Sequence, residues 1–528
     1  YAKDRLSGVA TVRGSRLALY GFQAASVEAD AELGGGETQR VEARVFLKGP
    51  AVGPVRVDTA QVKSTGTVGD HAIRVLLESG EGRMEATLRG GCEKAAWKGS
   101  LEVLRGTDAA GPWGLQAPAP ITFSAVRSSV GPLLIAGGEG ESFEFSMDVS
   151  GDPGKGFLAA GWRKLNLARF GFVLPDWRIQ GRTEGRFRAD FRGKSRTAVS
   201  SEAALAANLA RGSQTLDVKE TAGKLDWDDS GLAAFARADL GPSGRVDARI
   251  KSPDPPRFGV PDRGDFRITA DGLDAALFQP LLPDALAMTG TLSGTAAGKL
   301  LPRSQWDVAG EARLSGGGFS LKDEKGQVTA QAEKAQLRWA WRDKTLSGDL
   351  DLRLARHGTL EAAFRLPVPA RLPVAIDGTG PVQLAVRADM REKGLLSALF
   401  PGLIQESRGR VELNGAVSGT WDSPRVNGAL KVGEAGATLP APGIRVSDVT
   451  MEARFEDREI RVTSFRAVSG PGAIEGSGTL RIRDREIRHI EARLSGERFQ
   501  TVRLPELEML ASPDLTFEGA PKALKVRG

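Results

Sequence analysis

Alternating apolar and polar residues recur along almost the whole chain, in short runs that end at Gly, Asn-Gly, Pro or a charged turn. In residues 348–358, Leu350, Leu352 and Leu354 are separated by single charged residues. An alternation with period two predicts β-strands with one dry and one wet face, and such strands are typical of antiparallel sheets. We therefore expect an all-β protein: an elongated, mostly antiparallel sheet of many strands, curled into a U-shaped groove, with a few short helices.

The alternation also assigns a set of apolar side chains to the dry face of their strands. A sandwich would cover this face with a second sheet, whereas an open, curled sheet would leave an apolar trough along its length. A closed barrel or sandwich has the same local pattern. We predict that the trough forms and is lined by Phe187, Phe191, Leu350, Leu352, Leu354, Leu360, Phe364, Leu366, Val382, Leu384, Val386, Val411, Leu413, Leu480 and Ile482.

The pattern Leu-x-x-Ala-x-Phe occurs three times, at 165–170, 273–278 and 395–400, and a Pro follows each copy closely. Leu and Ala three residues apart share one helical face, so each copy predicts a short helix. The copies start 108 and 122 residues apart. This spacing predicts modules of about 110–120 residues, each with one short helix and about eight to ten strands.

Four segments follow from this spacing: an irregular β-groove segment at 1–160, and three β-groove modules at 161–270, 271–392 and 393–528. The range 251–265 is the richest in Pro and is the best candidate for a joint.

No residues point to catalysis, to a metal site or to a cofactor. Cys92 is the only cysteine, which excludes an intrachain disulfide and a Cys-based metal site. His71, His357 and His489 are far apart in the sequence and lack metal-ligand spacing. We expect these histidines to be solvated and Cys92 to be a small buried residue. No nucleophile elbow, phosphate loop or kinase motif is present, so we expect a protein that is not an enzyme.

Charge and aromatic content argue against nucleic acid as a partner. The net charge is +6, and aromatic residues make up 6% of the chain, which is low for a protein that stacks bases. The densest basic stretches, at 182–196 and 481–489, alternate with apolar or acidic residues. They are typical of a solvated strand face.

The sequence lacks a signal peptide, and its longest apolar run, 394–404, is interrupted by Pro401. That run is shorter than a membrane-spanning helix of roughly 18–20 residues. The alternation is already in progress at both ends, so we expect the chain to be a fragment of a longer protein.

A trough of this kind suits the movement of lipid through water. About 44 strand positions at about 4.8 Å each would extend on the order of 200 Å, which is comparable to the gap between two bacterial membranes. Each CH₂ group kept from water is worth about 0.8 kcal/mol, so two acyl chains of roughly 16 carbons represent on the order of 20 kcal/mol. We therefore favour a phospholipid conduit. The alternative is a scaffold whose edges template the strands of nascent outer-membrane proteins and autotransporters.

The C-terminal half carries turn motifs that resemble a known family. Gly419, Trp421, Pro424 and Gly428 form G-x-W-x-x-P-x-x-x-G, later strands are preceded by G-x-G, and Ser-Pro-Asp-Leu occurs at 512–515. Over about 270–528 these features resemble the TamB family, the inner-membrane subunits of the translocation and assembly module. AsmA-like and other repeating β-groove lipid-transfer proteins share the same pattern.

The resemblance implies a periplasmic β-groove in a Gram-negative bacterium, with an N-terminal inner-membrane anchor outside this fragment. It also implies an outer-membrane barrel partner of the TamA/BamA type, and it makes 393–528 the start of the TamB-like C-terminal region. The family is associated with phospholipid movement and with assembly of outer-membrane proteins and autotransporters. No catalytic residue or cofactor follows from the resemblance.

Overall fold

The computed structural model describes residues 7–528 except 20–21, 35–38, 54, 81, 152–153, 174–176, 194–195, 212–213, 258, 282–285, 324–325, 372–373, 394–402, 484–485 and 522. The chain divides into two compact units, Tyr1–Gly264 and Asp265–Gly528. The division falls at the end of the Pro-rich range 251–265. Each unit is described by itself.

Unit 1 consists almost entirely of antiparallel strands. Its strands are β1 (Gly8–Leu19), β2 (Phe22–Leu33), β3 (Arg40–Lys48), β4 (Ala51–Val52), β5 (Val55–Arg56), β6 (Thr59–Thr67), β7 (His71–Ser79), β8 (Gly82–Glu93), β9 (Ala96–Asp108), β10 (Gly111–Leu115), β11 (Ala119–Ser124), β12 (Arg127–Gly137), β13 (Ser142–Ser150), β14 (Lys155–Asn166), β15 (Arg178–Arg192), β16 (Thr197–Arg211), β17 (Gln214–Asp228), β18 (Gly231–Asp239) and β19 (Arg245–Ser252).

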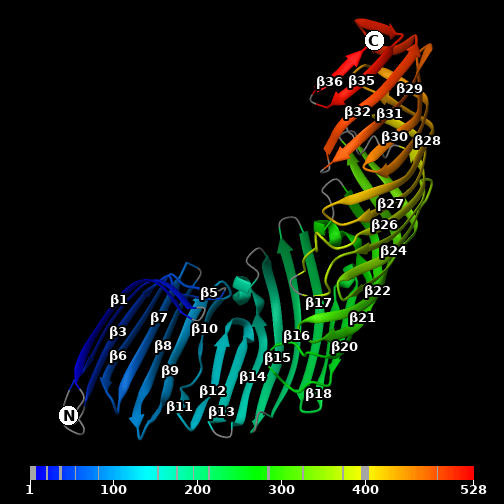
Figure 1. Ribbon diagram of the computed structural model, residues 1–528. Helices are drawn as coiled ribbons and strands as arrows, with labels where there is room; N and C mark the ends of the chain where they lie inside the picture. The colour runs from blue at the N-terminus through cyan, green and yellow to red at the C-terminus, as the bar shows by residue number, and fades with distance from the viewer. Residues whose placement is uncertain are drawn as a thin grey trace. The chain divides into compact units, whose positions relative to one another are not determined.

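Most strands of unit 1 pair with the next strand in the sequence (Figure 1). Two exceptions are local. The short strands β10 and β11 both lie between β9 and β12, so together they occupy one interrupted strand position. The small β4–β5 hairpin interrupts the connection from β3 to β6, and β4 pairs with the start of β2. From β12 to β19 the succession is regular.

Unit 2 repeats this plan with longer strands. They are β20 (Gly264–Asp274), β21 (Leu286–Leu301), β22 (Gln305–Asp323), β23 (Gly326–Arg342), β24 (Thr345–Leu354), β25 (Gly358–Leu366), β26 (Gln383–Lys393), β27 (Gln405–Gly419), β28 (Pro424–Leu439), β29 (Ile444–Asp457), β30 (Glu459–Ser469), β31 (Gly472–Arg483), β32 (Glu486–Glu497), β33 (Phe499–Leu504), β34 (Leu507–Ala511), β35 (Asp514–Ala520) and β36 (Ala523–Arg527).

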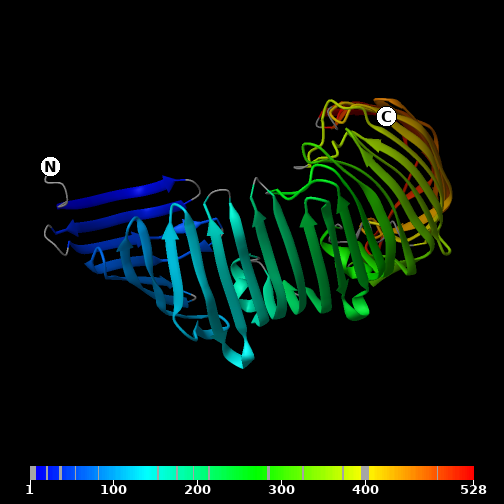
Figure 2. The ribbon, with the colours of Figure 1, turned by 90° about the horizontal axis from the view of Figure 1, so that it is seen from below.

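Strands β21 to β32 pair in sequence order, and β32 then pairs with β35 and β35 with β36. The hairpin β33–β34 forms a separate two-stranded sheet. In Figure 2 the yellow and orange strands of this unit bend into arcs, so its sheet is curled. The expected all-β class, with a many-stranded, antiparallel, curled sheet, is confirmed.

The described helical segments are all short 3-10 turns: η1 (Gly138–Gly140), η2 (Leu167–Val173), η3 (Gly241–Ser243) and η4 (Ala275–Leu281). The expected helices at 165–170 and 273–278 correspond to η2 and η4, but each turn begins two residues late. In both copies the first two residues still belong to the preceding strand, β14 or β20. The third expected helix, at 395–400, lies outside the described residues.

Insertions among the described residues follow three of the strands. Turn η2 follows β14, η4 follows β20, and the β33–β34 hairpin follows β32. The predicted range 271–392 contains six described strands, β21–β26, which is fewer than the expected eight to ten, whereas 393–528 contains ten, β27–β36. The expectation assumed about twelve residues per strand position, whereas strands here reach 19 residues, as in β22. In unit 2, β26 and β32 end at the same edge of the sheet, because antiparallel neighbours alternate in direction. We call this edge the insertion rim.

The strands form a layer that is mostly one sheet thick. Two separate compact domains of half this mass would together expose about 22,000 Å². The chain exposes 32594 Å². Few large apolar side chains are buried, and many described ones retain partial exposure. A second sheet does not seal the first within the described parts of the chain.

A buried ionic cluster fastens η2 to unit 1. Arg169 donates hydrogen bonds to both carboxylate oxygens of Glu141, at 2.8 and 2.6 Å, and to Asp108 at 2.5 Å. The Asn166 backbone N–H also donates to Glu141, at 2.9 Å. The Arg169 and Glu141 side chains are only 10% and 7% exposed. Burial disfavours the charged form of Glu141, but these hydrogen bonds outweigh burial and hold its pKa below the ordinary value.

We expect Arg169→Met to destabilise unit 1 by about 3–5 kcal/mol at pH 7, because it leaves the Glu141 charge buried without a partner. Urea unfolding followed by circular dichroism would measure the change. The matched control is Arg186→Met, which removes an exposed pair with Glu202 and should cost less than about 1 kcal/mol. Equal costs for the two variants would contradict the structural role of the cluster.

The same cluster predicts a pH dependence. Since the folded-state pKa of Glu141 is lowered, its stabilisation is complete above the unfolded-state pKa of about 4.3 and is lost as the pH falls through the lowered value. The stability difference between wild type and Arg169→Met should therefore shrink below about pH 4. A difference that stays constant on acidification would show that the carboxylate is not the group involved.

Candidate apolar groove

Cross-strand pairing in unit 2 aligns apolar residues into continuous rows. Residues directly opposite each other on neighbouring strands lie on the same face of a sheet. Row 1 runs from β21 to β36 and contains only apolar residues and one Gly: Leu292, Leu314, Ala335, Leu352, Leu360, Ala388, Leu413, Leu430, Ala453, Val462, Gly478, Ala492, Phe517 and Val526.

Three further rows lie on the same face, which we call the apolar face. Row 2 contains Leu337, Leu350, Ala362, Val386, Gly415, Gly428, Phe455, Ile460, Leu480 and Ile490. Row 3 contains Leu354, Gly358, Met390, Val411, Val432, Met451, Phe465, Gly476, Leu494 and Leu515. Row 4 contains Gly310, Trp339, Gly348, Phe364, Leu384, Val417 and Val426.

The opposite, polar face carries charges at matching positions. One of its rows contains Gln336, Asp351, Glu361, Arg387 and Asn414. The separation of the two faces is therefore consistent across successive strands, as period-two alternation requires.

Most residues predicted to line a groove fall into these four rows. Row 1 holds Leu352, Leu360 and Leu413; row 2 holds Leu350, Val386 and Leu480; row 3 holds Leu354 and Val411; and row 4 holds Phe364 and Leu384. Leu366 pairs with Leu346 beside row 4. Val382 directly precedes β26, where its N–H donates to the Gly419 carbonyl at 3.0 Å. Ile482 lies in β31, but its side chain is outside the described part of the structure.

The two predicted residues of unit 1, Phe187 and Phe191, lie on one face of β15. Phe187 pairs with Ala160 and Ser201, and Phe191 pairs with Gly156 and Thr197. The hydroxyl side chains of Ser201 and Thr197 therefore interrupt the apolar residues that run across strands here. The apolar face of unit 1 is less continuous than that of unit 2.

Partial burial is the rule on the apolar face. Of the predicted lining residues, Leu354 and Val382 are buried, at 8% and 6% exposure. The others whose side chains are described are half-buried, including Leu350, Leu352 and Phe364. Neighbouring side chains cover these residues only in part, so some of their apolar surface remains accessible to a ligand.

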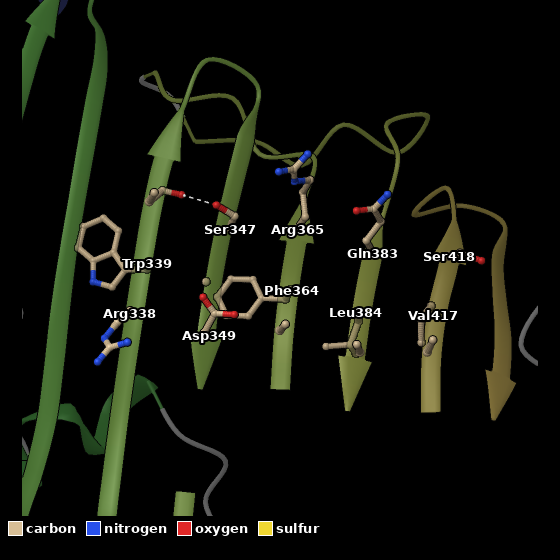
Figure 3. Close-up of a pocket in the computed structure, with 15 residues that line it drawn as sticks. Arg338, Trp339, Ser347, Asp349, Phe364, Arg365, Gln383, Leu384, Val417 and Ser418 are labelled. Atoms are coloured by element: carbon tan, nitrogen blue, oxygen red, sulfur yellow. Dashed lines mark hydrogen bonds between the residues drawn. The ribbon is translucent and has the colours of Figure 1, made fainter. Parts of the chain in front are cut away.

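A hollow of about 770 Å³ lies against β23–β27 (Figure 3). Its lining includes Trp339, Phe364 and Leu384 of row 4, together with polar-face residues such as Arg338 and Arg365. Figure 3 shows these side chains on successive strands of one layer. Every residue that lines the hollow belongs to these adjacent strands, so a single sheet bounds it.

Some apolar-face residues escaped the sequence analysis because their strands are irregular. Val462 and Phe465 both face the apolar side, yet they are three residues apart, because a register shift separates them in β30. Shifts also occur in β28 and β29, where Val432 and Met451 were missed. A bulge adds one residue and breaks strict alternation. Apolar pairs three residues apart within a strand pattern would have been the available signal.

Aromatic rings cover several glycines of the apolar face. Gly310 pairs with Trp339, and Gly348 pairs with Phe364. A Cβ atom on either glycine would lie within 2.8 Å of the opposing ring. Gly415 differs, because its partner is Gly428 and the nearest atom to an added Cβ would be 3.8 Å away. Glycine thus makes room for rings at the first two positions and leaves open surface at Gly415.

Two expectations about single residues were wrong. Cys92 is exposed, since it lies near the end of β8 beside the turn to β9. His357 is 6% exposed, because β26 extends past its turn: the Arg391 N–H donates to the His357 carbonyl at 2.7 Å, and the His357 Nδ1 lies 3.3 Å from the Arg391 carbonyl oxygen. His489 pairs with Glu491 at 2.9 Å, and His71 Nε2 accepts a hydrogen bond from the Trp97 indole N–H at 3.1 Å.

Charges on the polar face are largely paired across strands and exposed. Arg410 donates to Asp389 at 2.7 Å, and this hydrogen bond lowers the pKa of the Asp389 carboxyl. In the basic stretch 182–196, Arg186 pairs across strands with Glu202, and Arg188 pairs with Asp190 on its own strand. Such exposed pairs contribute little to stability, and they fit the expected solvated face.

Among the residues that the structure describes, no group of three or more His, Cys, Asp or Glu side chains is placed to hold a metal ion. The described segments also contain no helix long and apolar enough to cross a membrane.

We expect Gly348→Val to destabilise unit 2 by about 1–3 kcal/mol, because the added side chain overlaps the Phe364 ring and the Arg338 carbonyl. The matched variant Gly415→Ala enters open space and should be neutral or stabilising by up to about 1 kcal/mol. Urea midpoints of the two variants test the contrast. A similar loss in both would mean that the rings do not fill these positions.

Comparison with known proteins supports the resemblance noted in the sequence. Residues 255–432 match the family model described as TamB, N-terminal domain. The match includes β20–β27 and every residue that lines the hollow, and it overlaps the first part of the range 270–528 that resembles the family. A search of curated proteins found no match. The match over 255–432, about a third of the chain, together with the long antiparallel sheet, supports a TamB-type protein.

Proposed function

We propose that this chain is part of a periplasmic conduit in which the apolar face shelters phospholipid acyl chains between the inner and outer membranes. The observation that carries the proposal is row 1, which crosses unit 2 from β21 to β36 without a polar side chain. An acyl chain beside this row would meet apolar surface at each strand. The headgroup would stay at the open side, in water.

The energetics support a route of this kind. Moving a two-chain phospholipid through water exposes roughly 30 CH₂ groups, at about 0.8 kcal/mol each. Half-buried side chains such as Leu352 and Leu360 offer an apolar surface along the path. Because neighbouring sites are alike, a lipid could shift from one strand to the next without a large change in free energy.

The proposal requires no catalytic group and no cofactor, since translocation breaks no covalent bond. The TamB-type assignment supports a periplasmic location, an inner-membrane anchor elsewhere in the full protein, and an outer-membrane barrel partner of the TamA/BamA type. Nucleic acid has no place in this function. Phospholipid is the ligand proposed for the predicted lining residues of both units.

A charge placed on row 1 should block the route. We expect Leu352→Asp, and likewise Leu384→Arg on row 4, to lower phospholipid transfer between vesicles about tenfold or more. A desolvated charge beside an acyl chain costs several kcal/mol, and each 1.4 kcal/mol is about tenfold. Native mass spectrometry of the purified protein should show less co-purified lipid.

The matched control for Leu352→Asp is Asn414→Asp. It adds the same charge beside row 1, but on the polar face opposite Arg387. Circular dichroism would show that both variants keep the sheet. Transfer by Leu352→Asp equal to that by Asn414→Asp would rule out the apolar face as the lipid path.

Crosslinking separates the conduit from the strand-templating scaffold. Photo-crosslinkers at Leu352 and Leu413 report on the apolar face, and probes in the turns at the strand ends report on the edges. Lipid adducts at the first two positions support the conduit. Polypeptide adducts confined to the edges would support the scaffold instead.

A further inference from the structure

We propose that the β33–β34 hairpin is a gate at the insertion rim of unit 2. In the closed position Phe499 occupies a place on the apolar face that an acyl chain would take, and the hairpin lifts to let a phospholipid chain enter or leave there. This inference rests on the proposed function, because it assigns the same ligand to the same face.

The sheet does not depend on the hairpin. Strands β32 and β35, which flank it in the sequence, pair directly with each other, as in Leu494 with Leu515. At the base of the hairpin the Gly496 N–H donates to the Pro513 carbonyl at 2.8 Å, and the Arg498 N–H donates to the Ser512 hydroxyl at 3.0 Å. The chain therefore leaves and re-enters the sheet at adjacent points, and the hairpin can move while β32 and β35 stay paired.

Phe499 is the part of the hairpin that reaches the apolar face. It is 7% exposed and packs with Ile444 and Ala467, against which Phe465 and Ile474 also pack. Phe465 is a member of row 3, next to Met451 and Gly476. Withdrawal of Phe499 would therefore open an apolar site that continues a row of the proposed groove.

The other described attachments of the hairpin to the rim are few. The Arg503 N–H donates to the Pro442 carbonyl at 2.7 Å. Gln500 is buried, but its amide donates to Glu508 within the hairpin, at 2.7 Å. The insertion η2 of unit 1 is fastened differently, by the buried ion pairs of Arg169. An aromatic contact can be exchanged for an acyl chain, whereas a buried ion pair has no such substitute.

The closed position also contains an unfavourable feature. Ser469 is 1% exposed, and its hydroxyl has no hydrogen-bond partner within the described residues. It precedes Gly470, where an added Cβ would lie 2.8 Å from the Cβ of Gln500 in the hairpin. A buried polar group without a partner favours a state in which water reaches it. Lifting the hairpin would hydrate this part of the rim.

The hairpin itself has an apolar side that is open to solvent. Val502 pairs with Met509, and Leu504 pairs with Leu507, so all four side chains lie on one side. Leu504, Leu507 and Met509 are 40%, 52% and 45% exposed. Phe499 lies at the base of the hairpin, where the hairpin meets the apolar face of the sheet. An acyl chain that displaces the Phe499 ring would therefore continue onto the hairpin's apolar residues.

A first test opens the gate. With the photo-crosslinking amino acid benzoylphenylalanine in place of Phe465, we expect Phe499→Ala to raise phospholipid adducts severalfold in the presence of phosphatidylethanolamine–phosphatidylglycerol vesicles. The matched control Leu510→Ala removes an exposed hairpin side chain and should leave adduct formation at the wild-type level. Adduct formation that is the same in Phe499→Ala and wild type would overturn the gate.

A second test closes it and does not depend on loss of a buried ring. In a Cys92→Ser background, Pro442→Cys with Arg503→Cys places two thiols at the contact between the rim and the hairpin, where the Arg503 N–H donates to the residue 442 carbonyl. Oxidation should reduce lipid adducts at position 465 severalfold, and a reductant should restore them. Unchanged adducts in the oxidised form would also overturn the gate.

A probe at Leu352 distinguishes failure of the gate from failure of the conduit. Suppose that lipid adducts form at Leu352, but that neither Phe499→Ala nor oxidation of the double-cysteine variant changes adduct formation at position 465. This result would reject the gate and leave the conduit in place. Absence of lipid adducts at Leu352 in the wild-type protein would reject the conduit, and the gate with it.

Discussion

Antiparallel backbone pairing is the constraint on which the rest of this structure depends. Each interior strand is hydrogen-bonded on both sides, and the pairing fixes which residues stand opposite each other. Because Leu352 pairs with Ala335 on one side and Leu360 on the other, one apolar position carries over to the next strand. A slip of one residue would turn a strand's apolar side chains to the polar face. The long rows therefore exist only while the register is kept, including at the bulges of β28–β30.

A sheet mostly one layer thick must stabilise itself without a closed core. Side chains on the apolar face shield one another across strands, and rings such as Trp339 and Phe364 lie over glycines on the strand beside them. Long strands provide many backbone hydrogen bonds, and the polar face keeps its charges paired and in water. The remaining half-exposed apolar surface costs stability. It is also the feature that makes the fold suitable for an acyl ligand.

The insertions between strands differ from one another, although the strands that they interrupt are regular. Turn η2 of unit 1 is held by Arg169, which pairs with both Glu141 and Asp108. The β33–β34 hairpin of unit 2 is held instead by the packing of Phe499, by buried Gln500 beside Gly470, and by a backbone hydrogen bond of Arg503. Insertions can thus differ in how firmly they are held while the strands continue unchanged. In a conduit, that difference would decide where a lipid can leave or enter.

The sequence by itself determined the strands, their two faces and the class of protein, because period-two alternation is a local property of residues such as Leu350, Leu352 and Leu354. Most of the residues that it predicted to line a groove share one face of the sheet. It did not determine the number of strands in a module, the apolar partners hidden by bulges, such as Phe465, or the burial of His357 and exposure of Cys92. Those depend on strand length, on register and on which distant strand covers a turn. Only the tertiary structure decided that the apolar face stays partly open, because sealing requires a second layer, and alternation within one strand is the same with or without it.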